Sequence, residues 1–385
     1  DRLFYALRAD ALTGYKYYYE LAEEAFNVNL MDYDAQIHSV FLQWWNARDD
    51  IGGSGWQYRS AAAAVGITEA VVESDLAVRW VQRQFNASGS EAKLDTVALI
   101  QRIRETLPSL GEVTQYQLTS YEITARSQQT DLDDKTVAEI ERAFADNLYG
   151  LCNRVDVNAT DLVKFLAKDA RAFAEYEAGF FQRSVLGHHG LAVQHFTKSI
   201  RLYKELNFEI NQARSLNDRA YALAKIADIE SAIFSIEDAL ILRTELGLAR
   251  SVALSLNTKG LIYVYASKPS TAVALCQQAL SVFLQLEDEW GEMLAYLALS
   301  EANRRKSEGD GIKLEDKAAA LIAAGEFSHR CQQLALKLKV APPLHAEILD
   351  EYACALRDRA KYLRDVRRDK NSQDTIDQLW EQAAK

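Results

Sequence analysis

The sequence predicts an all-α fold, a superhelical solenoid of antiparallel helix pairs built from repeats of about forty residues. Only 4 prolines and 17 glycines occur among 385 residues, and 49% of the chain is apolar, which suits helices and leaves little material for hairpin turns. Small and large apolar residues also recur every forty positions. They include Ala192, Ala232, Ala272, Leu206, Leu246 and Leu286. Repeats of this length indicate stacked helix pairs, because one pair cannot bury its apolar face alone.

Turn-forming stretches divide the repeats into helices of about 14 to 17 residues. The turns expected within repeats are LGHHG (186–190), IADIE (226–230) and ASKPS (266–270), and those expected between repeats are LNFEIN (206–211), LGLAR (246–250) and LEDEW (286–290). Small residues fall where two helices of a pair would meet. We therefore expect Ala232 and Ala272 to be buried against the preceding helix.

Three domains are expected along the chain. Residues 166–305 carry the repeats, and residues 306–385 form a divergent helical repeat with capping helices after the polar insertion KSEGDGIKLED. Residues 1–165 are helical by periodicity without a visible repeat. They are either degenerate repeats or a separate helical domain that caps the solenoid.

Charge and cysteine usage narrow the function classes. A net charge of −11 argues against a general nucleic-acid or membrane-surface binder. No run of 18 apolar residues is present, so no membrane span is expected. The four cysteines, Cys152, Cys276, Cys331 and Cys354, lie in apolar helical stretches without metal-ligand spacing, which favours free thiols packed as small hydrophobes in a reducing, cytoplasmic setting. Because the chain begins without methionine and within a helical pattern, we expect it to be part of a longer protein.

The repeats resemble the tetratricopeptide repeat (TPR), whose usual period is about 34 residues. Ala192 and Phe196 form an A-x3-F pair on one helical face. The runs ALSLNTKGLIY (253–263) and LALSEANRR (297–305) make the likeness more specific: residues 170–365 resemble the TPR sensor region of bacterial STAND proteins, signal-transduction ATPases with numerous domains. That resemblance implies a module that receives a protein or small ligand and passes the event to an ATPase.

The sequence departs from a complete STAND protein because it has no G-x-x-x-x-G-K-[ST] phosphate loop. Nucleotide hydrolysis is therefore not assigned to this chain, and no enzyme activity is expected of it. A stand-alone TPR scaffold or adaptor is the alternative. An enzyme with its site in residues 1–165 is the least favoured hypothesis. Self-association, or assembly with an ATPase module, is a further expectation.

The resemblance places partner binding on the concave face, which the first helix of each pair lines. The residues that the repeat register assigns to this face are Arg214, Asn217, Tyr221, Lys225, Asn257, Leu261, Tyr265, Glu301, Arg304 and Arg305. Arg304 and Arg305 would pair with carboxylates, so an acidic protein or peptide partner is expected. For Asn217 and Asn257 there are two interpretations: they bridge neighbouring helices within the stack, or their amides contact a partner.

Two other stretches have patterns found in binding elements. Arg357, Lys361, Arg364 and Arg368 share one helical face, but interleaved aspartates favour a solvated helix that closes the solenoid over one that docks onto an acidic surface. Residues 59–81 have the spacing of a helix-turn-helix around Gly66. The second helix of that motif would carry carboxylates and no basic residue, so no direct DNA binding is expected.

The remaining motifs indicate packing instead of chemistry. His188 and His189 lie in a turn without carboxylates or cysteines at metal-ligand spacing, which favours an exposed loop. The aromatic runs YKYYYELAEEAF (15–26) and FLQWWN (41–46) favour core packing over a cofactor site. No cofactor and no metal ion are expected.

Overall fold

The computed structural model consists of α-helices joined by turns, and no β-strand occurs within its described residues. Those residues are 2–27, 30–47, 55–86, 90–107, 110–129, 132–153, 159–309, 311–340, 342–366 and 370–384. The prediction of an all-α chain is confirmed. Consecutive helices pack against each other in sequence order, as helical repeats do. The chain divides into two compact units: the first is residues 1–181 with 198–212, and the second is residues 182–197 with 213–385. The domain boundaries expected from the sequence stay predictions.

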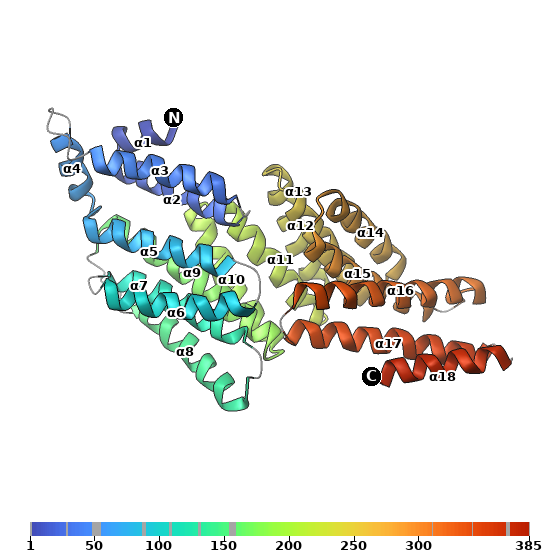
Figure 1. Cartoon of the computed structure of the whole chain (residues 1–385). Helices are drawn as coiled ribbons and strands as arrows, with labels where there is room; N and C mark the ends of the chain where they lie inside the picture. The colour runs from blue at the N-terminus through green and yellow to red at the C-terminus, as the bar shows by residue number, and fades with distance from the viewer. Residues whose placement is uncertain are drawn as a thin grey trace. The chain divides into compact units, whose positions relative to one another are not determined.

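The first unit contains the non-repetitive helices (Figure 1). They are α1 (Arg2–Ala9), α2 (Ala11–Asn27), α3 (Met31–Ala47), α4 (Gly55–Ala64), α5 (Glu69–Asn86), α6 (Ser90–Thr106), α7 (Glu112–Ser127), α8 (Asp134–Asn153) and most of α9 (Asp161–Ser184). Their largest apolar core is aromatic. Tyr15 and Tyr18 of α2 pack on Phe41 of α3, and the rings of Tyr18 and Phe41 stack with centroids 4.2 Å apart. The aromatic runs therefore form core, as expected.

The second unit contains most of the repeats. Its helices are part of α10 (His189–Leu206), nearly all of α11 (Glu209–Lys225), then α12 (Ile229–Glu245), α13 (Ala249–Tyr265), α14 (Pro269–Gln285), α15 (Glu289–Ser307), α16 (Leu314–Leu338), α17 (Pro342–Val366) and α18 (Lys370–Ala384). Helices α11 to α14 have 17 residues each, at the upper end of the predicted range. The last helices are longer, and α16 and α17 have 25 residues each. The register of the repeats therefore ends at α15.

The turns of the repeats explain the forty-residue period. A residue with a left-handed backbone follows each helix at intervals of twenty positions, and these residues are Gly187, Asn207, Ala227, Gly247, Ser267 and Glu287. After α11, α12, α13 and α14 the chain reverses in three residues. After α11, for example, the amide of Ala227 donates to the Ala224 carbonyl at 3.0 Å and the amide of Asp228 donates to the Leu223 carbonyl at 3.0 Å. One helix with its turn occupies twenty residues, so an antiparallel pair occupies forty.

Small residues allow close helix contact, as predicted. Ala232 and Ala272 are both 0% exposed, and Ala272 packs against Val264 of the preceding helix. A Cβ atom added at Gly260 of α13 would lie 2.3 Å from the Sγ atom of Cys276 on α14. Glycine is therefore required where these two helices approach each other.

The cysteines are less uniform than the sequence suggests. Cys276 and Cys331 are buried, and burial raises the pKa of the Cys276 thiol to about 12. Cys354 is half-buried and Cys152 is exposed, so the expectation that every thiol is packed in the core is wrong for Cys152. Helix periodicity gave the correct element there but not the correct side of it.

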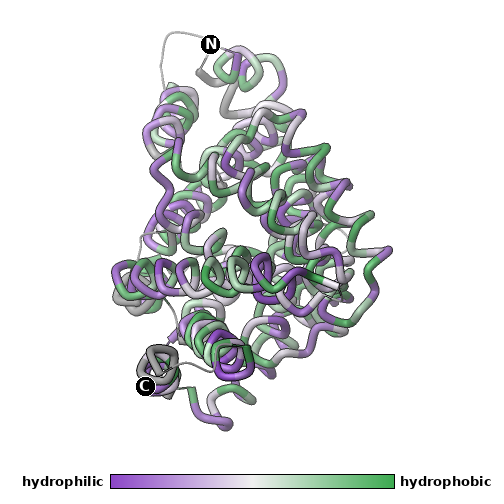
Figure 2. Tube along the Cα trace, turned by 90° about the vertical axis from the view of Figure 1, so that its right-hand side faces the viewer, coloured by the Kyte–Doolittle hydropathy of each residue, from purple (hydrophilic) through white to green (hydrophobic). Residues whose placement is uncertain are grey.

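Hydrophobic and hydrophilic stretches alternate along the helices, so most helices are amphipathic (Figure 2). Within the described part of the chain, no helix combines the length and the apolar character needed to cross a membrane. The face carrying Arg357, Lys361 and Arg364 belongs to α17, where Lys361 and Arg364 are exposed. Arg368 lies outside the described residues. Helix α17 does not end the described structure, because α18 packs against it.

Candidate partner-binding face

The ten residues assigned to partner binding lie on three alternate helices of the second unit. We call the surface formed by these ten residues the predicted partner face. Four come from α11, three from α13 and three from α15. The forty-residue register places Tyr221, Leu261 and Glu301 at equivalent positions, and Lys225 is equivalent to Tyr265. The structure brings Tyr221, Lys225, Tyr265 and Glu301 into one cluster, whereas the others are dispersed around it.

Lys225 is the exposed cation of this cluster. Its Nζ atom lies 5.3 Å from the ring centroid of Tyr221 and 4.9 Å from that of Tyr265, so one ammonium rests on two aromatic rings. Among the described residues it forms no direct ion pair, although the Glu301 carboxyl lies close enough for the two charges to interact. The guanidinium of Arg183 lies 5.2 Å from the ring centroid of Tyr221, so two cations lie near this ring. The cluster therefore presents a positively charged group on a fixed aromatic support.

Phenols and carboxylates complete the cluster. The Tyr221 hydroxyl donates to Oε1 of Glu347 on α17 at 3.4 Å. Burial, reinforced by Glu347, raises the pKa of Tyr221, and burial together with Glu301 raises that of Tyr265. Burial also raises the pKa of the Glu301 carboxyl, and nearby Glu351 adds to the effect. Both phenols thus stay protonated at neutral pH and remain able to donate hydrogen bonds.

Asn217 links three helices of the stack. Its Oδ1 atom accepts from Nη1 of Arg243 at 3.3 Å and from Oγ of Ser255 at 3.2 Å. Arg243 also donates to Oγ of Ser255 at 2.7 Å and to the Ser251 carbonyl at 2.9 Å. The amide of Asn217 therefore joins α11 to α12 and α13. Of the two interpretations given above, this is the bridge between neighbouring helices.

Asn257 has the same kind of position one repeat later. Its Nδ2 atom donates to the Leu294 carbonyl of α15 at 3.3 Å, and the residue is 6% exposed. Its Oδ1 atom is buried without a hydrogen-bond partner among the described groups. Both asparagines thus act between helices, and the structure shows no exposed ladder of amides.

Arg304 is internal, which corrects its expected place on an open face. The residue is 8% exposed; its Nε and Nη2 atoms donate to the two carboxylate oxygens of Glu351, at 3.2 and 3.1 Å. Oγ of Ser300 donates to the same carboxylate at 2.9 Å, and Asp358 lies 3.5 Å from Nη1 of Arg304. The residue was misplaced because the register places helices of a pair but does not predict the acidic face of α17. A contact of Arg304 with a partner stays a prediction.

The other assigned residues are peripheral. Arg305 is exposed and pairs at 3.1 Å with Glu308, the residue that caps the end of α15. Arg214 is exposed on α11. Leu261 is half-buried and packs in the cluster that contains Cys276. These three residues frame the predicted partner face without joining its polar cluster.

Sequence reasoning missed three contributors. Arg183 precedes the clearest repeats, and Glu347 and Glu351 lie on α17, where the register has ended. His189 was expected to be exposed in a loop, but it begins α10 and is half-buried; only His188 is exposed. Burial lowers the pKa of His189, and the positive charges of Lys225 and Arg183 add to this effect. The acidic spacing Glu347, Glu351 and Asp358 on one helix was the available signal for the α17 contacts.

The first unit holds a buried polar network that the sequence did not reveal. The Arg79 guanidinium donates to Glu23 at 2.7 Å and lies 4.6 Å from the ring centroid of Tyr19. The Tyr19 hydroxyl donates to Asp169 at 2.8 Å, and Tyr18 donates to Asp75 at 2.6 Å. Burial, with the charge of Glu23 close by, raises the pKa of Asp169 to about 8.

The network also accounts for the apparent helix-turn-helix. Gly66 has a φ of 87° between α4 and α5, so the turn exists as the spacing predicts. Asp75 and Arg79 of α5 are buried in the network, where their charges hold α5 against α2. The second helix of the motif is thus part of a core.

No protein-family model matches the chain. A search of curated proteins finds no match either. The resemblance to TPR sensor regions of STAND proteins therefore rests on the residues of this chain alone.

Proposed function

We propose that the chain is a protein-recognition module that binds an acidic segment of a partner protein on the predicted partner face. Its repeats would form a TPR-like superhelical solenoid, and this solenoid would be the sensor region of a larger ATP-dependent signalling protein. No catalytic step is assigned to the chain. A stand-alone scaffold or adaptor would use the same face and is the alternative within this proposal.

One observation carries the proposal. Lys225 is exposed, rests on Tyr221 and Tyr265, and forms no direct ion pair with a described carboxylate, although the charge of Glu301 acts on it. An ammonium held on two rings loses little side-chain freedom when it binds an anion, which favours affinity. A carboxylate of a partner would complete the ion pair with this ammonium.

The internal contacts of α17 support an acidic partner. Glu347 already accepts a hydrogen bond from Tyr221, and Glu351 is held by Arg304. Side chains of the predicted partner face therefore bind carboxylates of another helix of the same chain. An acidic helix or strand of a partner would bind beside them at Lys225.

The proposal is tested by binding of labelled acidic peptides to the whole chain, measured by fluorescence anisotropy across a peptide library. We expect Lys225→Glu to weaken every peptide that binds by at least about tenfold, because the ion pair becomes a repulsion. Lys268→Glu is the matched control. Lys268 is also an exposed lysine above a tyrosine ring, 5.8 Å from the Tyr263 centroid, but it lies in the turn before α14. Equal losses in the two variants would show a general charge effect and contradict the proposal.

A further inference from the structure

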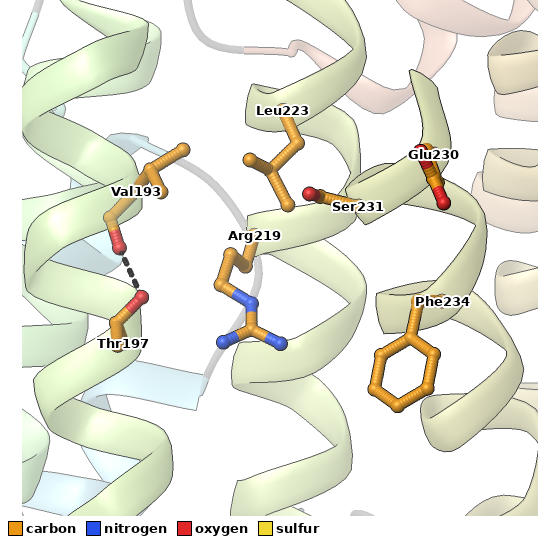
Figure 3. A pocket seen from close by; sticks show the side chains of 7 residues that line it. All are labelled: Val193, Thr197, Arg219, Leu223, Glu230, Ser231 and Phe234. Carbon is orange, nitrogen blue, oxygen red and sulfur yellow. Dashed lines mark hydrogen bonds between the residues drawn. The ribbon is translucent and has the colours of Figure 1, made fainter. Parts of the chain in front are cut away.

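A second candidate site lies on other helices of the second unit. A hollow of ≈ 440 Å³ opens between α10, α11 and α12 (Figure 3). This volume falls within the range of small-molecule sites. Val193 and Leu223 form apolar walls, and Phe234, which is 67% exposed, forms the third. An exposed phenylalanine beside two aliphatic side chains offers apolar surface to a ligand.

Arg219 provides the charge within this hollow. Its Nε atom donates to Oγ of Ser235 at 3.1 Å, and that hydroxyl donates to the Leu216 carbonyl at 2.9 Å. The guanidinium is thereby oriented from one side. Its terminal nitrogens face the hollow and make no hydrogen bond or ion pair to any described residue (Figure 3). Burial lowers the pKa of Arg219 and outweighs the opposing attraction of Asp238, which is consistent with an incompletely neutralised charge.

Comparison with the next repeat shows that Arg219 lacks a carboxylate partner on the preceding helix. Lys259 occupies the register position of Arg219, and its Nζ atom pairs with Glu237 at 2.6 Å. The position equivalent to Glu237 holds Thr197 in the earlier repeat. The hydroxyl of Thr197 donates to the Val193 carbonyl of its own helix at 2.7 Å, so α10 supplies no carboxylate to pair with Arg219.

The apolar wall is also specific to the earlier repeat. The position of Phe234 is occupied by Ala274 one repeat later. The earlier repeat thus has an oriented guanidinium at Arg219 and a large exposed ring at Phe234, and it has a threonine where the next repeat has a carboxylate. The repeat after it has an internal ion pair and a methyl group at the same positions. Glu230 also lines the hollow, and its carboxylate repels an anionic ligand more strongly as the ligand's negative charge increases, which disfavours a second negative charge.

We propose that this hollow binds a monocarboxylate attached to an apolar group. The terminal nitrogens of Arg219 would hold both carboxylate oxygens, taking the place of the side chain that Glu237 supplies in the next repeat. The apolar group would lie against Val193, Leu223 and Phe234. Such a ligand is either a free carboxylic acid or the C-terminal residue of a peptide, and the chemistry recognised is the same. The site lies on helices α10 and α12 as well as α11, and it does not depend on the predicted partner face.

The test uses isothermal titration of the whole chain with 3-phenylpropionate, with 3-phenylpropionamide and with a tripeptide that ends in phenylalanine. We expect the acid to bind and the amide to bind about ten- to a hundredfold more weakly, because charged hydrogen bonds to Arg219 are lost. Tighter binding of the tripeptide would identify a peptide terminus as the source, and tighter binding of the free acid would identify a small molecule. Either order supports the site.

The decisive variant is Thr197→Glu, which copies the Glu237 arrangement. We expect its new carboxylate to pair with Arg219, to weaken acid binding at least about tenfold and to leave the melting temperature no lower than that of the wild type. Glu237→Thr is the matched control, and it should bind the acid like the wild type. Equal binding of acid and amide, unchanged binding in Thr197→Glu, or no saturable binding of any carboxylate probe at millimolar concentration would each overturn the proposal.

Discussion

Arg304 and Glu351 form a two-pronged ion pair that joins α15 to α17, with donor–acceptor distances of 3.2 and 3.1 Å. Both side chains are about nine-tenths buried, with 10% of each exposed. Removal of one partner would leave the other charged and unpaired inside the structure. Ion pairs in such places are therefore costly to break, even though an apolar replacement of both partners is often tolerated.

Arg304→Glu should lower the free energy of unfolding by about 3 kcal/mol or more, because two carboxylates would then face each other inside the structure. Urea unfolding monitored by circular dichroism measures the change. Arg305→Glu is the control: Arg305 is exposed, so its replacement should change stability by less than about 0.5 kcal/mol. Equal stability of the two variants would mean that the pair with Glu351 contributes nothing.

Ala272→Arg should destabilise the repeats by several kcal/mol, on the order of 3 to 5, because a charge enters a close contact between helices. Ala272 is fully buried against Val264 and Ala302. Ala274→Arg, on the exposed side of the same helix, is the matched control and should melt close to the wild type. A wild-type melting curve for Ala272→Arg would show that the forty-residue register is wrong.

The left-handed turn residues predict a pair of opposite effects. Ala227 and Gly247 occupy equivalent turn positions with φ values of 63° and 69°. A side chain costs about 1 kcal/mol in this conformation. Ala227→Gly should therefore stabilise the chain, and Gly247→Ala should destabilise it, each by up to about 1 kcal/mol in thermal or urea unfolding. A Cβ at Gly247 meets no atom within 4 Å, so a loss there would arise from the backbone alone. The same sign for both variants would contradict this account of the turns.

The pKa of Asp169 predicts how stability depends on pH. Burial raises this pKa to about 8, so the folded carboxyl keeps its proton up to that pH, whereas the unfolded one loses it near pH 4. The folded state thus binds more protons in this window, and the contribution of Asp169 to stability falls as pH rises through it. Asp169→Asn removes that dependence. Its free energy of unfolding relative to the wild type should rise between pH 5 and pH 8, by no more than about 1.4 kcal/mol per pH unit.

Urea unfolding at several pH values within that window measures the effect. Asp133→Asn is the control, because a hydrogen bond from Thr136 lowers the pKa of Asp133. The stabilisation from that carboxylate is lost only as pH falls, so the difference between Asp133→Asn and the wild type should stay constant from pH 5 to pH 8. An equally constant difference for Asp169→Asn would show that its carboxyl is ionised in the folded state.

The repeats could be predicted because local sequence determines them. Ala232 and Ala272 mark helix contacts directly, since only small side chains fit there, and helix length follows from the spacing of turns. The twenty-residue spacing of the turns was harder to predict, because Ala227 and Glu287 adopt the left-handed backbone conformation, which alanine and glutamate rarely adopt. Turn chemistry is informative chiefly where glycine supplies it.

The candidate sites depended on contacts that no local pattern specifies. Arg304 shares a sequence pattern with exposed arginines, yet the partners that bury it stand forty-seven positions or more along the chain. The Arg219 hollow needed knowledge of both Thr197 and Ser235, which lie on different helices. The network of Glu23, Arg79 and Asp169 likewise arises from helices without a repeat to align. Side-chain partners over such separations require the fold.

The most direct test of the central claim is hydrogen–deuterium exchange of the whole chain with and without the tightest acidic peptide from the library. If the predicted partner face is the binding site, exchange should slow in residues 214–225 of α11 and 257–265 of α13, with no change in α14. The protection should disappear in Lys225→Glu and persist in Lys268→Glu. Protection confined to residues 1–165, with none in α11 or α13, would contradict the account and move recognition to the first unit.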